Sequence, residues 1–191
     1  MSFTRWLATF LGFPLGGFLA VLVVGSVDSP FSASLAGLLA GSVIGTAQWL
    51  VLRSHGVGIR WVLHTAAAMA AGNGAAAVVT DAGTTVSDLM VTGLVVGAAV
   101  GAAQGVLLGR GRRVAAVWAT VVSLAWASGW AVTANVIVDA ERGYVTMGAS
   151  GALFATVVTG LALRRILART GVRAPSSAPA GPTGTAVAAT R

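Results

Sequence analysis

The sequence contains no cysteine and no lysine, and charged residues make up only 9% of its 191 positions. Without cysteine there can be no disulfide bond, thiol chemistry or cysteine-ligated metal. Without lysine there is no phosphate-binding loop of the type that ends in Gly-Lys. An ordinary soluble domain carries about 25% charged residues, so this chain has too few charges to cover its surface in water.

Catalytic motifs are also missing. No serine has a histidine and an aspartate at a recognisable nucleophile–base spacing, and no group of histidine, aspartate and glutamate has the spacing of metal ligands. No carboxylate lies inside an apolar segment, which disfavours the proton- and cation-coupled transporters that use one there. We therefore expect a protein that is not an enzyme and that carries neither a metal nor another cofactor.

Long apolar segments dominate the chain, which is 56% hydrophobic with a mean hydropathy of +0.86. A helix needs about 20 predominantly apolar residues to cross a bilayer. Six segments meet this requirement: 6–27, 31–52, 59–79, 89–108, 114–138 and 144–163. The sequence therefore predicts an all-α membrane protein with six transmembrane helices in residues 1–169. Residues 170–191 are rich in Pro, Ala, Ser, Thr and Gly, which predicts a disordered cytoplasmic tail.

The charges divide between the two sides of the predicted membrane. The acidic residues follow the first, third and fifth segments, whereas the loop arginines, except Arg142, lie at the opposite ends. By the positive-inside rule both termini are cytoplasmic. The arginine, alanine, glycine and valine usage suggests a bacterium, so we expect the bacterial inner membrane. The net charge of +7 then reflects topology, with the lipid bilayer and not nucleic acid as the partner.

Three outer carboxylates, Asp28, Asp81 and Asp139, follow successive odd-numbered segments. They could form an acidic mouth that attracts cations. The simpler interpretation is topological, because acidic residues occupy the loops from which arginine is excluded.

One motif occurs twice, 56 residues apart, as GLLAGSVIGTAQWLVLR and GLVVGAAVGAAQGVLLGR. A third copy keeps the small residues but lacks the glutamine. The three copies divide the chain into repeats of two helices at about 5–53, 60–110 and 117–165. Each repeat has an even number of spans, so the copies are parallel and related by an axis along the membrane normal. We predict a six-helix bundle with pseudo-threefold symmetry.

The four-residue spacing of the small residues places them on one face of a helix, where two backbones can approach closely. We expect the even-numbered helices to face the bundle interior and the tryptophan-bearing odd-numbered helices to flank them. The residues predicted to pack in this way are Gly37, Gly41, Gly45, Gly93, Gly97, Gly101, Gly151 and Ala155.

Polar residues inside the predicted spans are the candidate site. Gln48 and Gln104 continue the glycine stripe near the cytoplasmic end, either as a polar constriction or as partners in interhelical hydrogen bonds. Ala162 occupies the equivalent position of the third copy, so the three copies cannot form a complete polar ring. Asn73 lies between two glycines in mid-span, where it could contact a solute or make an interhelical bond. His64 could relay protons, because an imidazole can both accept and donate a proton near neutral pH, or it could bond a carbonyl.

Local signals predict how individual helices begin and bend. Ser29 and Pro30 predict the start of the second helix, and Ser87 can cap the fourth. Pro14 predicts a kink in the first helix. Indole rings favour the membrane interface, so we expect interfacial positions for Trp6, Trp49, Trp61 and Trp118.

The stretch Gly41-x-x-x-Gly45-x-x-Gln48-Trp-Leu-Val-Leu-Arg resembles a group of small bacterial multi-pass membrane proteins. They repeat a Gly-xxx-Gly-xx-Gln-x-Leu-x-Leu-Arg stretch followed by a tryptophan-bearing helix. The resemblance implies a membrane bundle and no particular activity. We expect a structural or assembly role, in which the small-residue surfaces bind lipid, a second copy or another membrane protein. The alternative is a small-solute or ion channel along the pseudo-threefold axis, lined by Asn73, Gln48 and Gln104.

Overall fold

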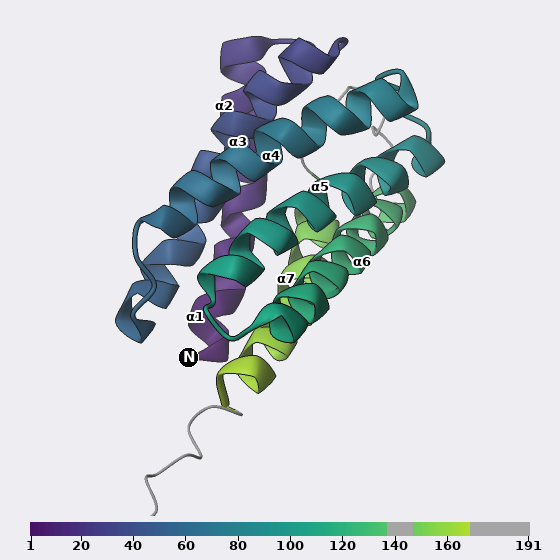
Figure 1. The fold of residues 1–191 in the computed structure, drawn as a ribbon. Helices are drawn as coiled ribbons and strands as arrows, with labels where there is room; N and C mark the ends of the chain where they lie inside the picture. The colour runs from purple at the N-terminus through teal and green to yellow at the C-terminus, as the bar shows by residue number, and fades with distance from the viewer. Residues whose placement is uncertain (137–146, 169–191) are drawn as a thin grey trace, which may run out of the picture.

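The structure is a computed structural model that describes residues 1–136 and 147–168. All regular structure in these residues is helical (Figure 1). Six helices are long and apolar enough to cross a membrane, which confirms the number predicted. The elements are α1 (Phe3–Leu7), η1 (Ala8–Leu11), α2 (Gly12–Val24), α3 (Pro30–Leu52), η2 (Arg53–His55), α4 (Arg60–Thr80), α5 (Val86–Leu107), α6 (Arg112–Val136) and α7 (Ala149–Ala168). The predicted tail, 170–191, lies outside the described residues.

Reciprocal capping boxes begin two of these helices. Ser29 caps α3, where its hydroxyl accepts from the Ser32 amide and the Ser32 hydroxyl accepts from the Ser29 amide. The predicted cap at Ser87 is wrong, because Thr85 caps α5 and Ser87 lies within its first turn. The Asp88 carboxylate accepts from the Thr85 amide at 3.2 Å. A carboxylate at this position also interacts favourably with the helix dipole, which explains why Thr85 is the cap.

The first span is not a continuous α-helix. It tightens into the 3₁₀ segment η1 immediately before α2, and Pro14 lies in the first turn of α2. Proline has no amide hydrogen, and its ring displaces the carbonyl four residues earlier, so the preceding turn cannot keep regular α-helical bonds. A kink was predicted at Pro14, and what the structure shows near it is a change of helix type.

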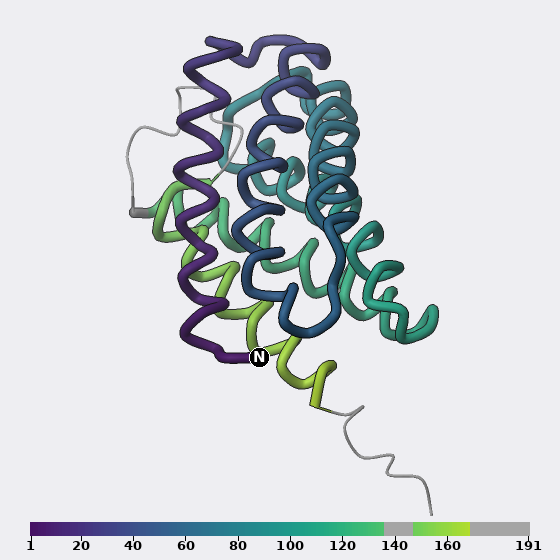
Figure 2. Tube along the Cα trace, turned by 90° about the vertical axis from the view of Figure 1, so that its left-hand side faces the viewer, coloured from purple at the N-terminus to yellow at the C-terminus, as the bar shows by residue number. Residues whose placement is uncertain are grey.

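Each span packs against the next one along the chain, and α7 packs against α1 and η1 (Figure 2). The connections α2–α3 and α4–α5 share one end of the bundle, where Val27 and Thr84 line a common pocket. The connections α3–α4 and α5–α6 share the other end, where His55 and Arg110 line a second pocket. The six spans thus form a closed ring of antiparallel neighbours.

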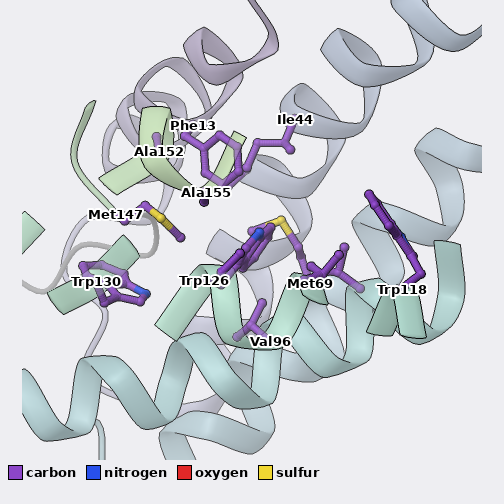
Figure 3. Close-up of a cluster of buried hydrophobic side chains, with 14 of the residues drawn as sticks. Phe13, Ile44, Met69, Val96, Trp118, Trp126, Trp130, Met147, Ala152 and Ala155 are labelled. Carbon is purple, nitrogen blue, oxygen red and sulfur yellow. The ribbon is translucent and has the colours of Figure 1, made fainter. Parts of the chain in front are cut away.

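Large side chains fill the middle of this ring (Figure 3). The Phe13 and Trp126 rings meet edge to face, with centroids 5.4 Å apart and planes at 69°. Ile44 and Met69 are fully buried in the same core. Large apolar side chains also face outward on several helices, including Phe18, Leu22, Phe31, Val78 and Val106. An outer surface of this kind is suited to lipid rather than to water.

The glycine stripes lie against the next helix in sequence. A Cβ on Gly41 of α3 would lie 2.8 Å from the Cα of Ala66 in α4, and a Cβ on Gly97 of α5 would lie 2.7 Å from the Cα of Ser123 in α6. In α7, by contrast, Gly151 meets Gly129 of the preceding helix. The even-numbered helices contribute Ile44 and Val96 to the core, and the tryptophan-bearing helices do more than flank them, because Trp126 is buried in the same core. A glycine stripe specifies a close approach but not which helix makes it.

The remaining predicted packing residues follow the same two seams. On α3, Gly37 lies against Met69 and Gly45 against Val62, both in α4. On α5, the stripe meets α6 through backbone contacts at Gly93 and Gly101. Ala155 on α7 is almost fully buried and lines the centre of the bundle.

Candidate functional site: a buried tryptophan and glutamine cluster

Gln48 of α3 and Gln104 of α5 are hydrogen-bonded to each other inside the bundle. The Gln104 Nε2 donates to the Gln48 Oε1 at 2.9 Å and to the Thr65 Oγ1 of α4 at 3.0 Å. The glutamine side chains are 8% and 1% exposed, respectively. Both residues end a glycine stripe at the same position of the repeated motif, which brings their amides to the same depth. These contacts join three consecutive spans.

Two tryptophans complete the cluster. The Trp61 Nε1 of α4 donates to the Gln48 Oε1 at 3.0 Å, and the Trp118 Nε1 of α6 donates to the Gln104 Oε1 at 3.2 Å. In each case the indole comes from the helix that follows the glutamine. A buried indole N–H has no water to bond, so it needs an acceptor within the protein. We call Gln48, Trp61, Thr65, Gln104 and Trp118 the tryptophan–glutamine cluster.

Within this cluster the two amide groups bond to each other, to the two indoles and to the Thr65 hydroxyl. The Gln48 carbonyl oxygen accepts from both Trp61 and Gln104. The Gln104 amide nitrogen donates twice while its carbonyl oxygen accepts from Trp118. An amide NH₂ carries two hydrogens, so the donor capacity of Gln104 is fully used. The cluster is therefore suited to holding helices together and offers little to a solute.

A third buried indole makes a related contact between the first and the last described spans. The Trp6 Nε1 of α1 donates to the backbone carbonyl of Thr156 in α7 at 3.1 Å. Its ring lies against Gly160, which has no side chain to keep it away. No glutamine is present at the equivalent position of α7, where the residue is Ala162, and here the main chain supplies the acceptor. This bond closes the ring of helices.

A small cavity lies between the cluster and the aromatic centre of the bundle. Its volume is about 10 Å³, and a buried water needs about 10–15 Å³. It can therefore hold one water at most. The residues around it include Trp6, Phe13, Gln48, Gln104, Ala155 and Thr159.

Three of the four tryptophans expected near the interface point into the bundle and not outward. Trp6, Trp61 and Trp118 are each at most 1% exposed. Only Trp49 is partly exposed, with the Arg53 guanidinium 5.8 Å from its ring centroid. A pattern in the sequence could have indicated that these indoles are buried. Tryptophans recur near the start of odd-numbered spans with nearly the period of the glutamines, so each indole donor can be matched to an amide acceptor.

The structure does not bring Asn73 and His64 into the cluster. Asn73 is 5% exposed, and its Nδ2 donates to the Met69 carbonyl of its own helix at 2.9 Å. It lies beside Gly37 and lines the pocket of about 40 Å³ at the end of the bundle that carries Asp28 and Asp81. His64 faces outward on α4, and its Nδ1 lies 2.9 Å from the Arg60 carbonyl.

The predicted outer carboxylates have local roles where the structure describes them. Asp28 accepts from the Ser32 hydroxyl at 3.4 Å, beside the start of α3. Asp81 ends α4 with a left-handed backbone, at a φ of 51°. Asp139 lies outside the described residues. Over residues 1–136 and 147–168, no group of three or more His, Asp or Glu residues is placed to hold a metal ion.

Comparison of the chain with protein-family models, curated proteins and solved structures found no match.

Proposed function

We propose that this chain is a structural or interaction protein of the bacterial inner membrane, with both termini in the cytoplasm. It would bind lipid or another membrane protein and would neither conduct a solute nor catalyse a reaction. The observation that best supports this role is the hydrogen-bonded pair Gln48–Gln104, with each carbonyl oxygen also bonded to a buried indole. The amides that a channel would present to its solute are bonded within the bundle.

The proposal includes three two-helix repeats around a pseudo-threefold axis. The similar roles of Trp61 and Trp118, each bonded to the glutamine of the preceding span, support two equivalent units. Trp6 bonded to α7 supports a third unit, formed between the two ends of the bundle. The described arginines and aspartates lie at opposite ends of the helices, which supports the cytoplasmic assignment of the arginine-bearing end.

The centre of the bundle argues against the alternative, a channel along the axis. A solute on this path would have to displace the edge-to-face pair of Phe13 and Trp126. It would also have to separate the bonded amides of Gln48 and Gln104. Both changes cost packing contacts or hydrogen bonds. The cavity beside these residues is about 10 Å³, so it has no room for a solute unless they move.

The surface that would contact lipid or a partner differs from the one expected from the sequence. The small-residue surfaces expected to bind partners contact other helices of the same chain, as Gly41 and Gly97 show. Contact with lipid or protein would then fall to the outward apolar side chains, such as Phe18 and Phe31, and to the ends of the helices.

Single cysteines test this role directly, because the chain has no native cysteine. We would place cysteine at Thr159 or Val100, which line the central cavity, and treat membranes with a small water-soluble thiol reagent. Ser54→Cys, in the exposed α3–α4 connection, is the control for reagent activity. We expect rapid labelling at position 54 and none at 100 or 159.

Flux through reconstituted vesicles completes the test. A structural role predicts no ion or small-solute flux above that of empty vesicles. Rapid labelling at both cavity positions, together with flux that the labelling blocks, would replace the structural role with the channel.

A further inference from the structure

A second, larger pocket lies at the end of the bundle opposite Asp28 and Asp81. Its volume is about 270 Å³, and the α3–α4 and α5–α6 connections meet there. The residues that define this arginine pocket are His55, Arg60, Trp61, Leu108, Arg110 and Leu167. Nothing in the tryptophan–glutamine cluster accounts for it, although Trp61 belongs to both.

No acidic residue in the described part of the chain lies near the cationic groups of the arginine pocket. The described acidic residues, Asp28, Asp81 and Asp88, all lie at the other end of the helices. Arg60 is exposed and Arg110 is half-buried beside the pocket. Positive groups gathered in a concavity with low-dielectric walls concentrate the potential and attract an anion.

The two connections hold the arginines at the rim of the pocket. Glycines with positive φ shape both turns, with values of 82° at Gly56 and 63° and 87° at Gly109 and Gly111. Arg110 lies between the latter two glycines, and Arg60 begins α4 directly after the first turn. Both guanidinium-bearing residues are thus placed by short, defined turns at the level where the spans end.

The pocket is also partly apolar. Leu107, Leu108 and Leu167 contribute to its wall, and Trp61 contributes an indole that is otherwise fully buried. A free inorganic anion gains nothing from leucine side chains. An amphiphile with an anionic head and an apolar chain would use both parts of the wall.

We propose that the arginine pocket binds the phosphate of an anionic phospholipid of the surrounding membrane, with its acyl chain beside the leucines. This deepens the proposed function and rests on it, since it places the end with the arginine pocket at a bilayer surface. Guanidinium groups bind phosphate oxygens in a planar, bidentate geometry. Basic pockets between transmembrane helices at the cytoplasmic side suit anionic headgroups for the same reason.

The test uses the full chain in lipid nanodiscs of phosphatidylcholine, with phosphatidylglycerol added as the ligand and bound lipid counted by native mass spectrometry. The double variant Arg60→Gln/Arg110→Gln removes both pocket charges. The matched control, Arg112→Gln/Arg113→Gln, removes the same charge at the start of α6 without altering the pocket wall. Inorganic phosphate is added in a separate arm as a competitor.

We expect the pocket variant to bind phosphatidylglycerol about 30-fold more weakly, because each arginine beside the bound headgroup strengthens binding about 5-fold. The control should lose a few-fold at most, because Arg112 and Arg113 do not line the pocket. An equal loss in both variants would overturn the proposal, since binding would then follow net charge alone. Retention of phosphatidylglycerol in the pocket variant would also overturn it, as would full competition by inorganic phosphate, which would assign a free-anion site.

Both variants must melt at the temperature of the unaltered chain in phosphatidylcholine, so that a loss of binding is not a loss of fold. The proposed structural role fails by a different measurement, namely thiol labelling of the central cavity. The two failures are therefore distinguishable.

Discussion

The side chains of Gln48 and Gln104 are bonded directly, through a 2.9 Å contact between residues 56 positions apart in the chain. Each occupies the same position of its copy of the repeated motif. The bond therefore joins equivalent residues of two copies of one sequence pattern, and it gives the repeat a function in the folded bundle. It also defines a thermodynamic cycle that can be measured.

We expect Gln104→Leu to lower the free energy of unfolding by about 1–3 kcal/mol, because it leaves the Trp118 N–H and the Thr65 hydroxyl without their partner. Combining it with Gln48→Leu should show a coupling of about 0.6 kcal/mol, the average for interhelical bonds in membranes. Thermal unfolding in detergent measures both. Thr46→Val, which removes an exposed hydroxyl from α3, is the control and should change little. Strictly additive losses would show that the pair does not interact.

The tryptophans allow a matched comparison on adjacent helices. Trp61→Phe removes a buried donor to Gln48, and we expect it to cost about 1–3 kcal/mol through the lost bond and the space left behind. Trp49→Phe changes a partly exposed ring that donates no described hydrogen bond to the bundle. Equal stability losses for the two variants would contradict the assignment of Trp61 to the cluster.

Glycine packing is tested by adding one methyl group. Gly97→Ala places a Cβ 2.7 Å from the Cα of Ser123, so α5 and α6 must separate. We expect a loss of about 1–3 kcal/mol, as for other overpacked contacts. Gly58→Ala is the control, because open space surrounds that position in the α3–α4 connection. A neutral Gly97→Ala would mean that the two helices are not in backbone contact.

Phe13 should limit the access of water to the cavity in the centre of the bundle. Phe13→Ala removes the ring that meets Trp126, and core truncations of this size cost about 3–5 kcal/mol in soluble proteins. In the Thr159→Cys background we expect faster thiol labelling once Phe13 is truncated. Phe18→Ala, at an outward position that is 64% exposed, should leave the labelling rate unchanged. An unchanged rate in both would place the barrier elsewhere in the bundle.

The proposed orientation makes a separate prediction for the two ends. A membrane-impermeant thiol reagent applied to intact cells should label Thr84→Cys, between α4 and α5, and should leave Ser54→Cys unlabelled until the cells are opened. The reverse pattern would place the arginine-bearing end outside and contradict the positive-inside assignment.

The six spans could be read from the sequence because length and hydropathy alone determine which segments can cross a bilayer. Ser29 was likewise predictable as a cap, because its signal is local. Ser87 was not the cap, since the choice between neighbouring hydroxyls depends on the carboxylate of Asp88. Local patterns therefore predicted the helices better than their exact ends.

The candidate site was predicted only in part. The repeated motif predicted Gln48 and Gln104 as polar residues of the candidate site. It did not identify their partners, and Trp61 and Trp118 were expected at the membrane interface. A preference for interfacial depth does not say whether an indole points toward lipid or toward the bundle. That choice depends on an acceptor supplied by another helix, and the sequence gives no direct sign of which helices are neighbours.

The contact between Trp6 and Thr156 has a consequence for biosynthesis. Its two residues are 150 positions apart, so at about 5–20 residues per second the ribosome makes the acceptor roughly 8–30 s after the donor. Throughout that interval the first span lacks the partner that finally covers its indole. Spans that are consecutive in the chain can pack together as soon as the second of them has been made. The contact between α1 and α7 has to wait for the last span. Insertion of α7 is therefore the event that completes the bundle, and a chain arrested before it would leave the Trp6 indole open to any neighbouring helix that offers a carbonyl.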